Sequence, residues 1–198
     1  MKSHNNISVG IFGGLFDPPH IGHLIICEWV LEEFSLNRII FIPAFNPPHK
    51  LNYSPYKHRY KMTKIAIKGN KRFFISDIEK KIKGRSYTFK VIKTLRKSDK
   101  IYQQANLYLI IGADQWNEIN HWKKPEVIFN ETNVIVLPRP NFEIKKIKPF
   151  YDKIIISSAP LIDISSTLIR DRIRRGLCVE YLTVPKVLEY IKKNKLYF

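Results

Sequence analysis

The chain has 198 residues, of which 44% are hydrophobic, and Lys and Arg outnumber Asp and Glu by 34 to 17. No apolar run approaches the ~18 residues that cross a bilayer, the N-terminus lacks a cleavable signal pattern, and Cys27 and Cys178 stand far apart, which argues against a membrane-spanning chain and a disulfide framework. We therefore expect a cytoplasmic protein with no membrane partner, built as a single domain over residues 1–198 with a helical C-terminal part from about residue 160.

The formal net charge of +17 raises the possibility of a nucleic-acid-binding protein. The Lys residues are scattered in small clusters, such as Lys80-Lys81 and Lys192-Lys193, and aromatic residues are not interleaved with them. Zinc-finger and RNA-recognition patterns are missing from the sequence. We favour solvated helix faces with no nucleic-acid partner, and a basic field of this kind would also attract a polyphosphate.

The first element is an apolar strand, Ile7 to Phe12, that runs directly into Gly13-Gly14. Paired glycines allow a tight turn and a close approach to the backbone, and the apolar spacing of residues 22–34 predicts a helix after the loop. A strand, loop and helix in this order present free helix amides to a phosphate. His20 and His23, three residues apart, are predicted to share one face of that helix and to point the same way.

The middle of the chain continues the alternation of strands and helices. We predict strands over 38–42 and 72–76, a helix over 57–68 that stops at Gly69, and a helix over 88–96 for which Ser86 or Thr88 could be the N-cap. Residues 106–111 form the most apolar strand candidate, and Asp114, which follows it, could cap a helix or bind a ligand at the carboxyl end of the strand. Trp122 could equally pack in the core.

Strands over 133–137 and 153–156 complete the predicted sheet. A helix starting at Ser165 or Ser166 runs to Gly176 and presents hydroxyls, free amides and Arg170 together, a combination that suits a triphosphate. The tail from Val184 to Tyr197 is predicted to be an amphipathic helix. Five or six strands alternating with helices predict an α/β fold, a parallel sheet with helices on both faces.

Six short motifs resemble those of one enzyme family. His20-Ile21-Gly22-His23 behind Gly13-Gly14 is similar to the (T/H)xGH signature of the nucleotidyltransferase superfamily, and residues 164–170 are similar to its ISSTxIR motif. The proline-rich loop that ends in Lys50, the Ser86-Tyr87-Thr88 element, Gly112-x-Asp114 and the Trp122-Lys123 pair narrow the resemblance to bacterial nicotinate-nucleotide adenylyltransferases, whose fold is Rossmann-like. Leu15, where Thr or Ser is usual, and Asn141, where Gly is usual, depart from the pattern, although Asn tolerates the left-handed region.

The resemblance implies a role for each matching residue. The catalytic groups would be His20, His23 and Arg170. ATP would contact these three and also Gly13, Gly14, Phe16, Gly112, Asp114, Ser166 and Thr167. Nicotinate mononucleotide would contact Lys50, Ser86, Tyr87, Thr88 and Trp122. Mg²⁺ would bridge the ATP phosphates without a protein cage.

The implied reaction converts ATP and nicotinate mononucleotide to deamido-NAD and pyrophosphate, a step of NAD biosynthesis. A phosphate monoester is already an anionic nucleophile at pH 7, so the enzyme needs to supply alignment and charge stabilisation and no activated Ser or Cys. Two alternatives stay open: another adenylyl- or cytidylyltransferase, such as pantetheine-phosphate adenylyltransferase, and a basic nucleic-acid-binding protein. A homo-oligomer is also left open.

Overall fold

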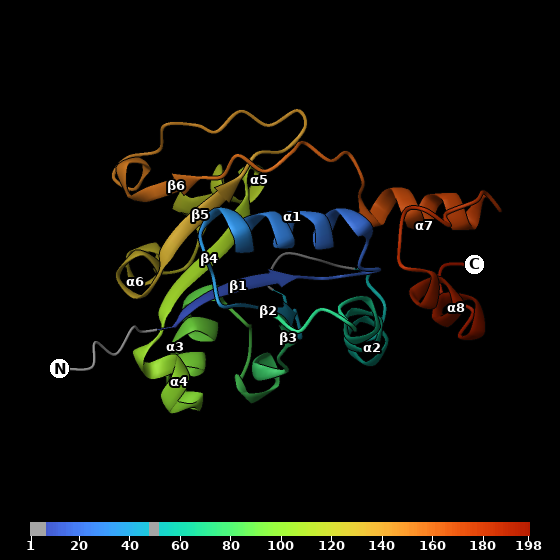
Figure 1. Cartoon of the computed structure of the whole chain (residues 1–198), viewed down its shortest axis with the longest axis horizontal. Coiled ribbons are helices and arrows are strands. Elements are labelled where there is room, and N and C mark those ends of the chain that lie inside the picture. Colours follow the sequence, from blue (N-terminus) through green and yellow to red (C-terminus); the bar gives the residue numbers. More distant parts are fainter. Residues whose placement is uncertain (1–6, 48–51) are drawn as a thin grey trace.

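The framework of the protein is a parallel sheet, seen in a computed structural model that describes residues 7–47 and 52–198 (Figure 1). Within these residues six strands pair in the order β3-β2-β1-β4-β5-β6, with every pair parallel. The strand order reverses between β1 and β4, and ligands of open α/β sheets bind at the carboxyl ends of the strands at such a point. The strands are β1 (Ser8–Gly14), β2 (Arg38–Pro43), β3 (Phe73–Ile75), β4 (Asn106–Gly112), β5 (Asn133–Leu137) and β6 (Ile154–Ile156).

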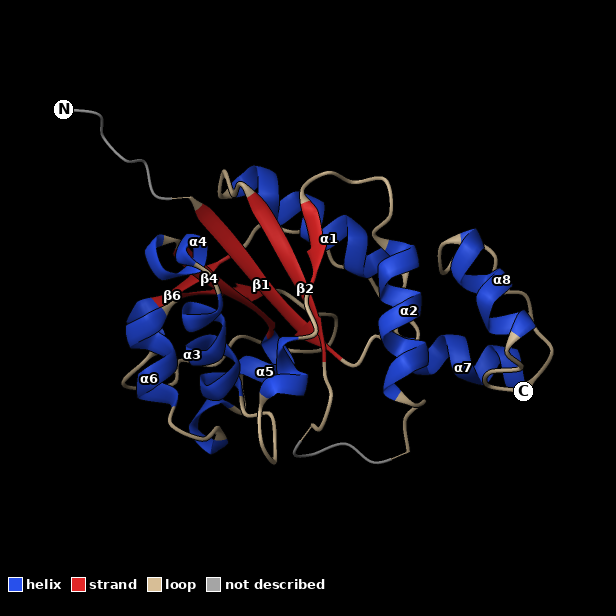
Figure 2. Cartoon of the chain, turned by 90° about the horizontal axis from the view of Figure 1, so that it is seen from below, coloured by secondary structure: helices blue, strands red, loops and turns tan. Residues whose placement is uncertain are grey.

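Helices cover both faces of this sheet, as the sequence predicted (Figures 1 and 2). Helix α1 lies on one face, and α3 and α6 lie on the other, while α2, α7 and α8 gather beyond one end of the strands. No helix of the described residues is long and apolar enough to span a membrane. The helices are α1 (Ile21–Glu33), α2 (Tyr56–Ala66), α3 (Thr88–Ser98), α4 (Lys100–Gln104), α5 (Ala113–Trp116), α6 (Pro125–Glu131), α7 (Ser166–Arg174) and α8 (Pro185–Lys193).

The alternation of side chains along each strand explains the two-sided core. In β2, Ile40 and Ile42 pack in a cluster with Ile92 of α3, whereas Ile39 and Phe41 pack with α1. Because both faces of a parallel sheet are covered, the central positions of β2, β4 and β5 are apolar on both faces, and the sequence shows unbroken apolar runs there. Each fully buried Ile or Phe of this kind contributes about 1.5–3 kcal/mol to stability.

A third cluster joins the C-terminal helices to α2. Met62 of α2 packs with Ile169 of α7 and with Val187 and Ile191 of α8, and all four side chains are buried. This packing fixes the first turn of α7 against the loop that follows β1. The apolar stripes of α7 and α8 therefore place the start of α7 beside the loop after β1.

The prediction of where the C-terminal helix ends is wrong. We expected it to reach Tyr197, but α8 ends at Lys193, and Lys195 and Tyr197 adopt positive φ values of 49° and 70°. Positive φ is incompatible with a right-handed helix, so the chain turns back toward the sheet. Helix α3 begins at Thr88, as predicted, but its N-cap is Tyr87, with no side-chain cap, in place of Ser86 or Thr88.

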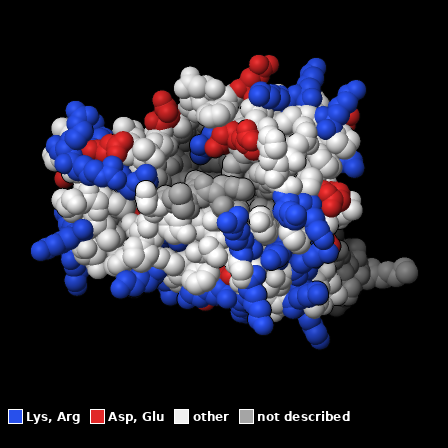
Figure 3. Space-filling model, turned by 180° about the vertical axis from the view of Figure 1, so that it is seen from behind, with Lys and Arg blue, Asp and Glu red and all other residues white. Residues whose placement is uncertain are grey.

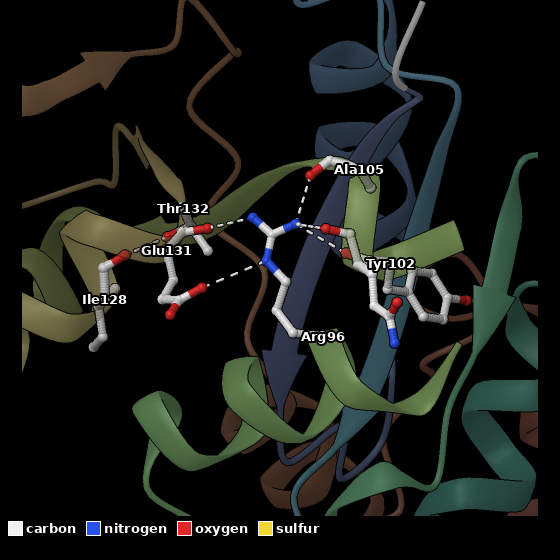
Figure 4. Close-up of polar contacts among 7 residues, drawn as sticks. Arg96, Tyr102, Ala105, Ile128, Glu131 and Thr132 are labelled. Carbon is white, nitrogen blue, oxygen red and sulfur yellow. Dashed lines mark hydrogen bonds and ion pairs between the residues drawn. The ribbon is translucent and has the colours of Figure 1, made fainter. Parts of the chain in front are cut away.

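One arginine holds together three elements at the opposite end of the sheet (Figure 4). Arg96 of α3 donates through Nη1 to the carbonyls of Tyr102 (2.8 Å) and Ala105 (2.7 Å), which lie in α4 and just before β4. Its Nη2 donates to the carbonyl of Glu131 at the end of α6 (2.8 Å), and its Nε lies 3.5 Å from the Glu131 carboxylate. Arg96 thus satisfies backbone acceptors that the ends of short helices leave unpaired.

Candidate active site

The loop after β1 depends on a glycine for its shape. A Cβ on Gly14 would come within 3.1 Å of the Phe16 ring, so the ring packs where any other residue would place a side chain. Phe16 itself has φ of 52° and is 2% exposed, and its ring lies edge-on to His23 with centroids 5.1 Å apart. Its side chain is therefore core packing beneath His23, which leaves only its backbone for the expected contact with ATP.

The two histidines meet as a stacked pair. His20 is the N-cap of α1, one residue outside the helix, so the two residues do not share a helix face as predicted. Their rings nevertheless stack with centroids 3.6 Å apart, and the backbone amide of His20 donates to Nδ1 of His23 (3.1 Å). Because Nδ1 of His23 accepts this bond, a neutral His23 carries its proton on Nε2.

His20 is the more buried of the pair. Its side chain is 6% exposed, and within the described residues its Nδ1 has no hydrogen-bond partner. Burial, with the positive charge of Arg139 nearby, lowers the pKa of His20 to about 4. His20 is therefore neutral at pH 7 and would act as a hydrogen-bonding group without a charge.

Three successive carbonyls of the loop are held by the C-terminal part of the chain. Arg170 of α7 donates through Nη1 to the carbonyl of Asp17 (2.9 Å), Ser166 donates its hydroxyl to that of Pro18 (2.7 Å), and Thr183 donates its hydroxyl to that of Pro19 (2.7 Å). Nη2 of Arg170 also donates to the hydroxyl of Thr167 (3.2 Å). The structure thus brings the predicted residues Ser166, Thr167 and Arg170 to the loop after β1.

The carboxyl end of β4 provides the other side of the site. Asp114, in the first turn of α5, forms an ion pair with Arg139 (3.4 Å), and a Cβ on Gly112 would come within 2.4 Å of the Asp114 carboxylate and 2.9 Å of Arg139. A larger residue at position 112 would therefore force the Asp114 or Arg139 side chain to shift. Asn141, which replaces the usual Gly, has φ of 65°, as expected for a residue that tolerates the left-handed region.

A cavity of about 420 Å³ opens between these ends of β1 and β4 and the start of α3. Its volume is in the range of sites that hold small molecules. Its deep wall is apolar, made by side chains such as Ile11, Ile42 and Ile111. Seven of the predicted site residues line it, namely Gly13, Gly14, Ser86, Tyr87, Thr88, Asp114 and Trp122.

A buried carboxyl that the sequence did not single out lies in the same wall. Glu79 is 6% exposed and accepts a hydrogen bond from the backbone amide of Phe45 (2.7 Å). Burial raises the pKa of Glu79. The amide of Ser86 donates to the carbonyl of Asn46 (3.2 Å), so the loop after β2 is tied to the segment before α3.

The remaining predicted residues fall into three groups. His20, His23, Ser166, Thr167 and Arg170 do not line the cavity and lie around the loop after β1. Gly112 and Phe16 shape the backbone beside it. Lys50 lies outside the described residues. The sequence analysis missed Arg139, although its place directly after a parallel strand was a usable signal, and Glu79, for which the sequence offered none.

Positive charge is not gathered into one patch on the face drawn in Figure 3. Lys and Arg are spread over the periphery of that face, and a hollow lies near its centre. Among the described residues, no group of three or more His, Cys, Asp or Glu side chains is arranged to hold a metal ion.

Comparisons with known proteins agree with this geometry. A family model described as "Cytidylyltransferase-like" matches residues 11–172. A Clostridium botulinum protein named "Probable nicotinate-nucleotide adenylyltransferase" is 40% identical, with 96% of this chain and 99% of that protein covered. A protein of the same name from Desulfitobacterium hafniense is also 40% identical, with 96% of this chain and 95% of that protein covered.

Solved structures share the fold. Plasmodium falciparum nicotinic acid mononucleotide adenylyltransferase complexed with NaAD has a TM-score of 0.75 at 22% identity, with 96% of this chain and 97% of that chain covered. The same protein complexed with APC has a TM-score of 0.76 at 20% identity and the same coverage. The family model, the two relatives that match along nearly their whole length, and the site at the reversal of strand order lead to one conclusion: the chain belongs to the cytidylyltransferase-like family and, within it, to the nicotinate-nucleotide adenylyltransferases.

Proposed function

We propose that the protein transfers the adenylyl group of ATP to nicotinate mononucleotide, giving deamido-NAD and pyrophosphate. The observation that carries the proposal is the cavity at the reversal of strand order, because its lining includes both Gly13, Gly14 and Asp114 and a second set, namely Ser86, Thr88 and Trp122. The first set suits the nucleotide and its phosphates, and the second suits a flat ring. Both substrates would thus meet at the loop after β1.

In this reaction a phosphate oxygen of the mononucleotide attacks the α-phosphorus of ATP, and the bond from that phosphorus to the bridging oxygen of pyrophosphate breaks. Arg170 is held at the loop by its bonds to Asp17 and Thr167, and its remaining N–H donors would meet the leaving pyrophosphate. His23 would donate from Nε2, and neutral His20 would support it by stacking. Catalysis on this proposal is alignment and charge stabilisation.

A divalent metal fits this site as a partner of the phosphates, and we propose Mg²⁺. The Asp17 carboxylate, which is the acidic group nearest the loop, already accepts hydrogen bonds from the Ser54 amide and the Tyr197 hydroxyl. Mg²⁺ commonly keeps waters and binds through substrate phosphates, and it would neutralise charge as pyrophosphate leaves. The thiols of Cys27 and Cys178 are both free, which is compatible with the proposed cytoplasmic location.

The test of the reaction is pyrophosphate release from ATP with three acceptors in turn: nicotinate mononucleotide, nicotinamide mononucleotide and phosphopantetheine. An amide would turn a donor toward the donors expected to bind the carboxylate, and such an unpaired contact costs about 1–3 kcal/mol. We expect kcat/KM to favour nicotinate mononucleotide by at least about tenfold. Equal use of both mononucleotides, or a preference for phosphopantetheine, would reject the proposed acceptor, and a salt-dependent gel shift without turnover would favour nucleic-acid binding.

Trp122 tests the placement of the ring. If the pyridine stacks on it, Trp122→Ala should raise the KM for nicotinate mononucleotide and leave ATP affinity nearly unchanged, while Trp122→Phe should restore most of the loss. Trp29→Ala is the matched control, because Trp29 is 42% exposed on α1 and does not line the cavity. A Trp122→Ala defect confined to ATP would show that the ring binds elsewhere.

A further inference from the structure

The C-terminal end of the chain reaches the loop after β1. Beyond α8 the backbone turns at Lys195 and Tyr197, and the Tyr197 hydroxyl donates to Oδ1 of Asp17 at 2.6 Å, across 180 residues of sequence. The other carboxylate oxygen of Asp17 accepts from the Ser54 amide at 3.0 Å. Asp17 is 1% exposed, so these bonds replace its contact with water.

The bond from Tyr197 has the character of a strong hydrogen bond. Its acceptor is a carboxylate, and its length is in the range of O–H donors to charged acceptors. Burial, together with the nearby Asp17 carboxylate, raises the pKa of the Tyr197 hydroxyl, so the group stays protonated and remains a donor at neutral pH. The sulfur of Met62 also lies within 3.9 Å of this hydroxyl.

Asp17 lies in the part of the loop after β1 whose carbonyls accept hydrogen bonds from the C-terminal part of the chain. Its own carbonyl accepts from Arg170, and the carbonyls of Pro18 and Pro19 are held by Ser166 and Thr183. On the N-terminal side of Asp17 in the same loop, Nη1 of the fully buried Arg59 donates to the carbonyl of Leu15 (3.0 Å). Carbonyl oxygens repel a phosphate, so donors that hold them keep the loop in a form that can accept an anion.

We propose that Tyr197 is a positioning residue for adenylyl transfer, which acts by holding the Asp17 carboxylate and, through it, the loop that carries His20 and the Arg170 contact. The inference rests on the proposed function, since it assigns the loop to the phosphates of ATP. Tyr197 thereby supports the part of the site that we assign to ATP, although its own side chain does not line the cavity.

The test compares two tyrosines of the same region. Tyr197→Phe removes only the hydroxyl that reaches Asp17. Tyr190→Phe is the matched control, because the Tyr190 hydroxyl lies 3.0 Å from Nδ1 of His58 and links α8 to α2 without touching the loop. For Tyr197→Phe we expect kcat/KM for ATP to fall about tenfold, with the KM for nicotinate mononucleotide within about twofold of the wild type. Tyr190→Phe should keep wild-type kinetics, and Tyr197→Phe should lower Tm more than Tyr190→Phe does, because it removes a donor from the buried Asp17 carboxylate.

A double-mutant cycle with Asp17→Ala identifies the route. Alanine leaves the Tyr197 hydroxyl without its acceptor, and the Tm of the variant shows whether it folds. If Tyr197 acts through the carboxylate, adding Tyr197→Phe to Asp17→Ala should cause little further loss. Wild-type kinetics in Tyr197→Phe, an equal kinetic loss in Tyr190→Phe, or fully additive losses in the cycle would each overturn the proposal. These outcomes differ from a failure of the proposed function, in which the wild-type protein itself would not release pyrophosphate from ATP and nicotinate mononucleotide.

Discussion

His20 shows how burial sets the protonation state of a side chain that we propose to be catalytic. Its pKa of about 4 lies below the ordinary value of 6.5, because burial and Arg139 disfavour the charged ring. Between pH 6.5 and 4 the unfolded chain therefore binds a proton at this site that the folded chain does not. The free energy of unfolding is fully retained above that window and falls as the pH decreases through it.

We expect protonation of His20 in the unfolded chain to lower the free energy of unfolding by about 2 kcal/mol between pH 7 and pH 5. Urea unfolding of the wild type and of His20→Asn at both pH values measures the effect, because asparagine is neutral and suits an N-cap position. The wild type should lose about 2 kcal/mol more than the variant over this interval. Parallel pH dependences of the two proteins would contradict the neutral, buried state assigned to His20.

The motif singled out His20 and His23, but it did not predict how they meet. The family that the (T/H)xGH resemblance indicated is confirmed by the relatives, whereas the roles it implies for the two histidines stay predictions. Helical spacing placed both rings on one face of a helix, whereas His20 is the N-cap and stacks on His23. A position one residue outside a helix follows from the capping geometry of the folded loop, which spacing alone does not determine.

At the scale of elements, long apolar runs were predicted well and short helices were missed. The strand predicted over 133–137 is β5 as observed, because a strand buried on both faces is apolar throughout. Helix α5 has four residues and α4 has five, which is too short for a helical period to appear in the sequence. The turn after Lys193 was missed because the amphipathic pattern continues beyond the helix into residues that pack against α2.

Short elements of this kind depend on single side chains, and Arg96 provides a test. Lysine cannot reach the carbonyls of Tyr102, Ala105 and Glu131 together, so Arg96→Lys should lower the free energy of unfolding by about 2 kcal/mol. The exposed pair of Arg174 with Asp171 is the control, and Arg174→Lys should cost less than about 0.5 kcal/mol. Urea unfolding measures both, and equal effects would show that Arg96 does not hold α3, α4 and α6 together. Turnover by Arg96→Lys at 25 °C should be unchanged.

At the scale of the whole molecule, the sequence predicted the fold class but not the strand order. Alternating strands and helices indicated a parallel sheet covered on both faces, which the structure and its solved neighbours confirm. The reversal of strand order between β1 and β4 depends on whether each crossover connection places the next strand on one side of β1 or the other. No local sequence pattern specifies that choice. Nor does any pattern pair Tyr197 with Asp17. Such contacts are decided by the packing of α2 with α7 and α8.

The same packing predicts how the chain unfolds. The third cluster includes Met62 and Ala66 of α2 as well as α7 and α8, and Thr183, Ser166 and Arg170 hold the loop of the sheet. Because these contacts cross from the sheet to the C-terminal helices, we propose that residues 1–198 form one cooperative domain.

Native-state hydrogen exchange can test this cooperativity. The amides of Ile169 in α7 and Val187 in α8 should require the same opening free energy as that of Ile11 in β1, within about 1 kcal/mol. Thr183→Val removes the hydroxyl that bonds to the Pro19 carbonyl, and in one cooperative unit this change should lower the opening free energies of all three amides by the same amount. A different result would be that the amides of α7 and α8 in the wild type have a much lower opening free energy than those of β1. The C-terminal helices would then be a separate unit that packs on the sheet and unfolds independently of it.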